Sequence, residues 1–202
     1  MRNAQAVVIA PDIRAKLMAY HCFHEPEAEM AAVIETFAAT RASAFLEIGT
    51  HKGFTSACIS LAFPRARVVS VDLPDPTRTQ WNPLARSLVG EAHRAFGLEQ
   101  QIEQRFVDSA ELWRFAGKGE SFDLVFVDGD HSPHAVFRDL ILAADLVPRN
   151  GGVVLAHDFT DTHEAWRPDW TVGVQQAVDQ FLEVRPFRKR RLPGLLVALE
   201  AA

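Results

Sequence analysis

Short apolar runs alternate along the chain with longer stretches in which apolar residues recur at helical spacing. The short runs are residues 44–48, 67–72, 102–108, 122–128, 151–158 and 195–200. Between them, the spacing predicts helices over residues 53–63, 85–97, 109–117, 133–147 and 173–184. Strands that alternate with helices in this way predict an α/β fold with a parallel sheet and crossover helices on both faces.

Both ends of the chain depart from this alternation. Two helices, predicted over about residues 12–22 and 27–40, precede the first strand. We therefore interpret residues 1–42 as an N-terminal helical cap or interface segment, and residues 43–202 as the main domain. Near the C-terminus, the turn signal Pro193-Gly194 separates the run "PFRKRRL" from "LLVALE". We expect these two runs to form an antiparallel hairpin at one edge of a seven-stranded, mostly parallel sheet.

Composition narrows the classes of partner and compartment. The chain has 202 residues, of which 48% are hydrophobic, which is enough for one well-buried core. Its net charge of −5 and pI near 5.9 disfavour nucleic acid as a partner. No apolar run approaches the roughly 18 residues that span a bilayer, so no membrane partner is expected. Cys22 and Cys58 have no metal-binding or redox spacing and no signal peptide pattern precedes them, which predicts a cytoplasmic protein.

The candidate chemistry lies where the strands end, because open sheets of this kind bind ligands at the carboxyl ends of their strands. In "EIGTHKG", Gly49 directly follows the first strand and Gly53 opens the next helix. Such a turn brings the backbone close to a ligand. The third glycine of the dinucleotide fingerprint is missing, which disfavours a pyrophosphate ligand. An ordinary strand-to-helix turn is the alternative interpretation.

Acidic residues and histidines end the following strands. Asp72 ends the second strand, and its carboxylate could accept both hydroxyls of a ribose. The fourth and fifth predicted strands end in "DGDHS" and "AHDF", which carry three carboxylates and two imidazoles. Carboxylate oxygens suit Mg²⁺, and an imidazole beside them could act as a general base. The alternative is that Asp128 only lines a pocket, while Ser132 and Pro133 begin the next helix.

Taken together, the motifs resemble a known family. "FLEIGTHKGFTS", "VVSVDLPDP", "FVDSAEL", "FDLVFVDGDHSPHAVFRDL", "GGVVLAHDF" and "GVQQAVDQFL" occur in the order and spacing of class I S-adenosylmethionine-dependent methyltransferases. The resemblance is narrower to small-molecule enzymes related to macrocin O-methyltransferases. It implies a Rossmann-like fold. The chain departs from the wider superfamily at His51, where a glycine is usual.

The resemblance also implies roles for single residues. The methionine part of the cofactor would lie against Glu47, Gly49, Thr50 and Gly53, with Glu47 near its ammonium group. Asp72 would hold the ribose, Asp108 and Ser109 would lie beside the adenine, and Asp128 would line the pocket. An acidic metal site present in some relatives would map onto Asp130 and Asp158. For Asp108 and Ser109, the start of a helix is an equally good interpretation.

The sequence thus predicts S-adenosylmethionine-dependent methylation of a small hydroxylated acceptor, with Mg²⁺ as a candidate assisting ion. The predicted catalytic residues are Asp130, His131, His157 and Asp158. The alternatives are an NAD(P)-dependent oxidoreductase and a cofactor-binding regulatory module without catalysis. We also expect a homodimer through the N-terminal helices, and substrate lids at residues 74–83 and 160–171.

Overall fold

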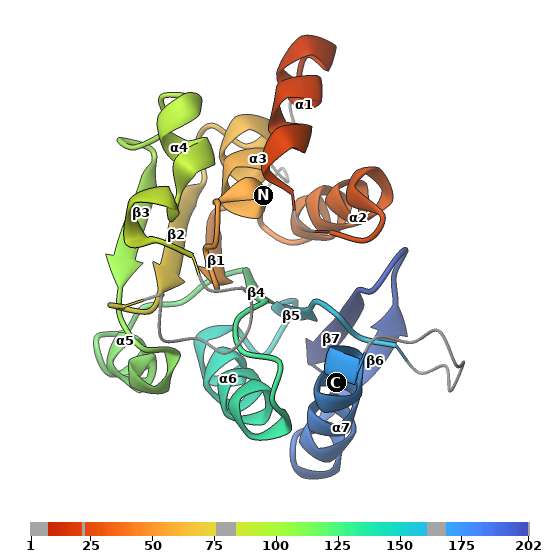
Figure 1. Cartoon of the computed structure of the whole chain (residues 1–202). Helices are drawn as coiled ribbons and strands as arrows, with labels where there is room; N and C mark the ends of the chain where they lie inside the picture. The colour runs from red at the N-terminus through yellow and green to blue at the C-terminus, as the bar shows by residue number, and fades with distance from the viewer. Residues whose placement is uncertain (1–7, 22, 76–83, 161–168, 202) are drawn as a thin grey trace.

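A mostly parallel seven-stranded sheet forms the centre of the molecule (Figure 1). We analysed a computed structural model that describes residues 8–21, 23–75, 84–160 and 169–201. The strands are β1 (Ala44–Ile48), β2 (Arg67–Asp72), β3 (Ile102–Phe106), β4 (Leu124–Val127), β5 (Val153–Ala156), β6 (Phe187–Arg191) and β7 (Val197–Ala201). Their order is β3-β2-β1-β4-β5-β7-β6, and β7 runs antiparallel to both β5 and β6. The predicted Rossmann-like fold with a C-terminal antiparallel hairpin is confirmed.

Helices cover both faces of the sheet. They are α1 (Pro11–Leu17), η1 (Met18–Tyr20), α2 (Pro26–Ala39), α3 (Phe54–Ala62), η3 (Arg86–Leu88), α4 (Glu91–Ala95), η4 (Ser109–Glu111), α5 (Trp113–Gly117), α6 (Pro133–Leu146) and α7 (Asp169–Val184). Alternate residues of each strand point to opposite faces. Phe45 therefore packs with α2 and α3 in one hydrophobic cluster, whereas its neighbour Leu46 packs with α6 and α7 in the other. Figure 1 shows these two pairs of helices on opposite sides of the sheet.

Two of the predicted helices are shorter or interrupted. The helix expected over 85–97 divides into η3 and α4, because Gly90 between them adopts a left-handed conformation and donates its N–H to the His51 carbonyl. The helix expected over 109–117 likewise divides into η4 and α5. In contrast, α7 begins at Asp169, four residues before the predicted start. These differences lie at element boundaries and leave the order of strands and helices as expected.

The N-terminal helices share the core of the sheet. Met30, Val33 and Phe37 of α2 are buried in the same cluster as Phe45 of β1. Residues from α1 and the following segment, Leu17 and Phe23, are buried there as well. The apolar side of α2, which suggested a dimer contact, is thus covered by its own sheet. Among the described residues, no helix is long and apolar enough to cross a membrane.

Candidate active site

The loop between β1 and α3 lies directly against the loop that follows β4. Gly49 has a φ of +93°, and a Cβ atom placed on it would lie 2.1 Å from the backbone oxygen of Asp128. Only glycine fits this position, because the obstruction is backbone and cannot rotate away. Thr50, the next residue, is buried, and its hydroxyl lies 2.7 Å from that of Ser70. The predicted cofactor loop is therefore held close to the end of β4.

Glu47 lies beneath the first turn of α3. Its carboxylate accepts hydrogen bonds from the Ser56 backbone N–H, at 3.1 Å, and from the Ser70 hydroxyl. Only 1% of the residue is exposed, and this burial raises the pKa of Glu47 to about 7, although the bonds from Ser70 and Ser56 oppose the rise. Glu47 thus serves as an internal partner for the first turn of α3. Its predicted proximity to a cofactor ammonium stays a prediction.

Gly53 is the residue immediately before α3, and the ring of a buried histidine packs directly against it. Gly53 has a φ of +79°, and a Cβ atom there would lie 2.4 Å from Nε2 of His93 on α4. The same nitrogen lies 2.7 Å from the Ser56 hydroxyl. Burial lowers the pKa of His93 to about 4, so the ring is neutral at neutral pH. Sequence reasoning did not select His93, which sits 40 residues from the loop it contacts.

Asp72, Asp108 and Ser109 also lie at the carboxyl edge of the sheet. Asp72 accepts hydrogen bonds from the backbone N–H groups of His51, at 2.9 Å, and Leu73, at 2.7 Å. Burial raises its pKa, although these bonds oppose the rise. Asp108 caps η4 by accepting from the Ala110 N–H at 2.8 Å. The expected helix start at Asp108 is therefore observed, while the contacts of these residues with ribose and adenine stay predictions.

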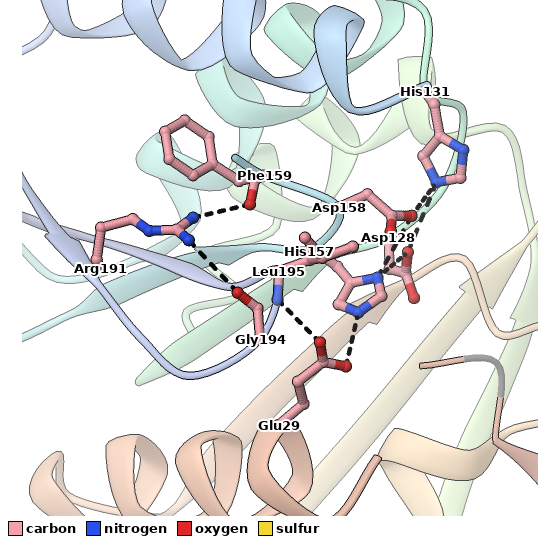
Figure 2. A network of polar contacts seen from close by, with 9 residues as sticks. All are labelled: Glu29, Asp128, His131, His157, Asp158, Phe159, Arg191, Gly194 and Leu195. Atoms are coloured by element: carbon pink, nitrogen blue, oxygen red, sulfur yellow. Dashed lines mark hydrogen bonds and ion pairs between the residues drawn. The ribbon is translucent and has the colours of Figure 1, made fainter. Parts of the chain in front are cut away.

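Four side chains meet at the ends of β4 and β5 (Figure 2). Nδ1 of His157 lies 3.2 Å from Oδ1 of Asp128 and 3.4 Å from Oδ2 of Asp158. Nε2 of His131 lies 3.0 Å from the same Asp158 oxygen and 3.8 Å from Asp128. We call Asp128, His131, His157 and Asp158 the rim cluster. Adjacent parallel strands bring these residues together, as the sequence predicted from their positions at strand ends.

Electrostatics inside the rim cluster favour charged side chains. Burial works against the protonated form of His131, but its contacts with Asp128 and Asp158 outweigh burial and raise its pKa to about 9. The charges of Asp128 and Asp158 likewise overcome the burial of His157 and raise its pKa well above its usual value. The two histidines in turn hold the pKa of both carboxyl groups below the usual range, against the effect of burial. The cluster is thus a set of mutually stabilised ions.

Asp130 makes a hydrogen bond with the backbone next to the cluster. Its Oδ1 accepts a hydrogen bond of 2.6 Å from the Ser132 N–H, at the start of α6. Among the described residues, the group whose atoms lie close enough to hold one metal ion is Asp128, His157 and Asp158, with ligand atoms within 4.8 Å of one another. This group shares Asp158 with the pair that the sequence suggested, and the role of Asp130 as a metal ligand stays a prediction.

Glu29 of α2 also contacts the rim cluster, and the sequence analysis did not identify it as a residue of the site. Its Oε2 lies 3.2 Å from Nε2 of His157, on the side of the ring opposite the rim carboxylates (Figure 2). Its other oxygen accepts a 2.9 Å hydrogen bond from the Leu195 N–H. Phe23 stacks on the His157 ring with centroids 4.5 Å apart. The N-terminal segment therefore takes part in the site. The two expected lids, at 74–83 and 160–171, fall largely outside the described residues.

Comparison with known proteins supports the fold and identifies the family. A family model described as a methyltransferase domain matches residues 46–159, which include the β1 loop and the rim cluster. No curated protein sequence matches the chain significantly. An O-methyltransferase from Bacillus cereus, solved in complex with S-adenosylhomocysteine, has a TM-score of 0.66 at 14% identity, with 96% of this chain and 93% of that chain covered.

Two further solved structures have the same architecture. A methyltransferase from Podospora anserina, bound to S-adenosylhomocysteine, has a TM-score of 0.65 at 16% identity, over 99% of this chain and 91% of that chain. The MycE methyltransferase of mycinamycin biosynthesis, in complex with Mg and S-adenosylhomocysteine, has a TM-score of 0.63 at 16% identity, over 94% of this chain and 53% of that chain. At these identities the likeness establishes a common fold.

Proposed function

The chain belongs to the methyltransferase domain family, and from this premise we propose that it transfers the methyl group of S-adenosylmethionine to a hydroxyl oxygen of a small-molecule acceptor. The observation that carries the proposal is the meeting of the glycine loop after β1 with the rim cluster after β4 and β5. The loop supplies a place for a cofactor, and the cluster supplies ionised groups for an acceptor hydroxyl. The oxidoreductase and regulatory alternatives are not favoured by the family match.

The residues of the loop suit this cofactor. Gly49 lets the loop lie directly against the backbone of Asp128, where any Cβ atom would collide. Asp72 is fixed by the N–H groups of His51 and Leu73, and a carboxylate keeps further lone pairs to accept ribose hydroxyls. When bound, S-adenosylmethionine supplies an electrophilic methyl group on a sulfonium. We assign Gly49, Thr50 and Gly53 to the methionine part, Asp72 to the ribose, and Asp108 and Ser109 to the adenine.

The rim cluster would bind and orient the acceptor. His131 and Asp158, which are both partly exposed, can donate to and accept from an acceptor hydroxyl. Alignment of that oxygen with the methyl group accounts for most of the expected acceleration. Because their pKa values are raised, both histidine rings are protonated on both nitrogens, and so positively charged, in the free protein at neutral pH. A histidine can therefore act as the predicted general base only after a substrate or cation has displaced one of these protons.

Metal assistance is part of the proposal. Asp128, His157 and Asp158 offer two carboxylate oxygens and one imidazole nitrogen, a donor set that suits a divalent cation. A bound cation would lower the pKa of an acceptor hydroxyl. Asp130, which the sequence suggested as a ligand, would act from the neighbouring loop. We also propose that the protein acts in the cytoplasm on a small-molecule acceptor.

Ligand binding tests the proposal directly. At about a hundred times its dissociation constant, a ligand stabilises by about 2.7 kcal/mol, and each kcal/mol moves the melting midpoint of a chain of this length by about 2–4 °C. S-adenosylhomocysteine should therefore raise the midpoint by about 5–11 °C, while NADH and NADPH should not. A shift with the nicotinamide cofactors alone would refute the methyltransferase assignment.

Turnover tests the rim cluster. Mass spectrometry should detect S-adenosylhomocysteine when a library of phenolic and sugar acceptors is incubated with S-adenosylmethionine. Asp158→Asn should reduce the rate with the active acceptor at least about a hundredfold while leaving cofactor binding intact. Asp179→Asn is the matched control, because Asp179 is exposed on α7 and pairs with Lys189. Equal rates in both variants would remove Asp158 from the site.

A further inference from the structure

His157 is held by carboxylates on both of its ring nitrogens. On one side, Nδ1 faces Asp128 at 3.2 Å and Asp158 at 3.4 Å. On the other side, Nε2 faces Glu29 at 3.2 Å. His157 is 3% exposed and its ring stacks on Phe23, so the ring is fixed in position as well as in orientation.

Glu29 is itself fixed. None of its surface is exposed, and its Oε1 accepts the hydrogen bond from Leu195 N–H, in the turn between β6 and β7. The remaining oxygen can therefore only face His157. Carboxylates accept but do not donate, so Asp128 and Asp158 compete with Glu29 for the ring protons of His157. A cation between Nδ1 and the two rim carboxylates would take the place of the Nδ1 proton, and Glu29 would then keep the proton of the neutral ring on Nε2. A carboxylate on the distal nitrogen is the usual partner of a metal-binding histidine.

The distances around Nδ1 match those between neighbouring ligands of a small cation. For metal–ligand bonds of about 2.1 Å, two adjacent ligands lie about 3.0–3.4 Å apart in octahedral or tetrahedral geometry. The two distances from His157 to Asp128 and Asp158 are 3.2 and 3.4 Å. Two of the three distances between ligand atoms therefore suit one small ion, and the third, between the two carboxylates, is at most 4.8 Å. Three carboxylates, counting Glu29, also face only two imidazoles here, so a divalent cation would balance the charge.

The imidazole nitrogen Nδ1 of His157 determines which kind of divalent cation the site would prefer. Mg²⁺ prefers oxygen ligands and binds imidazole poorly, whereas cations such as Co²⁺ and Zn²⁺ bind imidazole well. We infer that Asp128, His157 and Asp158 bind a divalent transition cation in preference to Mg²⁺, and that Glu29 is the positioning residue that directs His157 toward it. The cation site stands on the contacts of these residues alone. Only the part that the ion would play in methyl transfer rests on the proposed function.

Cation affinity measured by calorimetry tests this inference on the full-length protein after dialysis against a chelator. Co²⁺ and Zn²⁺ should each bind at one equivalent, at least about 100-fold more tightly than Mg²⁺. Asp158→Asn should abolish this binding. Equal affinity for Mg²⁺ and Co²⁺, or the absence of a stoichiometric cation, would overturn the inference. The second outcome would mean that His131 and His157 alone neutralise the rim carboxylates.

A spectroscopic signature identifies the ligand atom independently of affinity. Nε2–H of His157 is buried against Glu29, so it should exchange slowly with solvent. In the Co²⁺-bound protein it should give one strongly shifted exchangeable proton signal, which disappears in His157→Asp. That variant, with oxygen ligands alone, should also lower the ratio of Co²⁺ to Mg²⁺ affinity at least about tenfold. An unchanged spectrum in His157→Asp would show that another histidine binds the ion.

The role of Glu29 has its own matched pair of variants. Glu29→Gln should weaken Co²⁺ binding by about 10- to 100-fold, the usual loss when an outer partner of a ligand is removed. Glu35→Gln, on the exposed side of the same helix, should leave the affinity unchanged. Circular dichroism and melting curves establish that each variant is folded. If Glu29→Gln is folded and binds Co²⁺ as tightly as the wild type, Glu29 has no positioning role.

Parallel titration with S-adenosylhomocysteine separates this inference from the proposed function. If the cofactor product binds and no cation does, the inference fails and the methyltransferase assignment stands. If Co²⁺ binds as described and the cofactor product does not, the cation site stands and the proposed function fails.

Discussion

At the scale of single residues, the contact between Gly49 and Asp128 links the cofactor loop to the rim. We predict that Gly49→Ala lowers the free energy of unfolding by about 2–5 kcal/mol, the sum of a left-handed alanine and a collision with backbone. S-adenosylhomocysteine should also bind at least about tenfold more weakly. Chemical unfolding and calorimetry measure the two effects.

Gly97→Ala is the control that separates the two costs of Gly49→Ala, the collision with the Asp128 backbone and the left-handed backbone conformation. Gly97 also has a positive φ, +65°, but a Cβ atom there would meet nothing within 4 Å. This variant should lose only about 1–2 kcal/mol and keep its cofactor affinity. Equal losses in the two variants would mean that the close approach to Asp128 does not matter.

The buried carboxyl group of Glu47 should make stability depend on pH. Because folding raises its pKa from 4.5 to about 7, its contribution to stability is complete below about pH 4.5 and is lost as the pH rises through about 7. Glu47→Gln keeps an acceptor for the Ser56 N–H but cannot ionise. Relative to the wild type, the variant should therefore gain stability across this range, by up to about 3 kcal/mol. Urea unfolding at intervals between pH 4.5 and 8 measures the difference, and parallel profiles for the two proteins would contradict the assignment.

The residues of the site differ in how far sequence could predict them. Asp128 and Asp158 follow strands, and neighbouring strands in a parallel sheet must bring them together. Glu29 comes 128 residues before His157, and no local pattern connects the two. A signal was nevertheless present, because Glu29 shares a helical face with Val33 and Phe37, four and eight residues later. A carboxylate on an apolar helix face needs a buried partner.

At the scale of elements, α4 supports the loop that precedes α3. Gly90 and Ala92 donate backbone hydrogen bonds to the carbonyls of His51 and Lys52, at 2.9 and 2.8 Å. His93 fills the space between this loop and Ser56. The sequence predicted one helix over 85–97 and could not show this contact, because packing between α3 and α4 determines where the short helix begins.

Replacement of His93 tests the support that α4 provides. His93→Ala should lower the free energy of unfolding by about 2–5 kcal/mol at pH 7, because it opens a cavity and leaves the Ser56 hydroxyl without this partner. Folding lowers the pKa of His93 from 6.5 to about 4, so the wild type keeps the benefit above about pH 6.5 and loses it as the pH falls through about 4. The difference between the two proteins should shrink over that range. His134→Ala, at an exposed position of α6, serves as the control and should change stability little at any pH. A constant difference would show that His93 acts only by filling space.

At the scale of the whole molecule, the alternation of apolar runs and helices predicted the succession of strands and helices. The same pattern could not predict where the N-terminal helices pack. The sequence suggested that residues 1–42 form an N-terminal helical cap or interface segment. In the structure, Phe23, Met30 and Phe37 belong to the same buried cluster as Phe45. Periodicity identifies the apolar face of a helix, but it does not say whether that face meets its own sheet or a second chain.

Truncation distinguishes these two cases. Each large apolar side chain contributes about 1.5–3 kcal/mol when it is fully buried, and removal of residues 1–42 deletes five of them: Leu17, Phe23, Met30, Val33 and Phe37. The sum of about 8–15 kcal/mol is comparable to the whole stability of an ordinary domain, about 5–15 kcal/mol. We therefore predict that residues 43–202 alone show no cooperative melting transition, whereas Val8→Ser leaves the transition of the full-length chain within about 2 °C, since Val8 is 88% exposed. Light scattering of the full-length chain tests the expected homodimer at the same time. A shortened chain that melts cooperatively near the full-length midpoint would show instead that residues 1–42 are a separate unit, and a dimeric full-length protein would then assign their apolar surface to the partner.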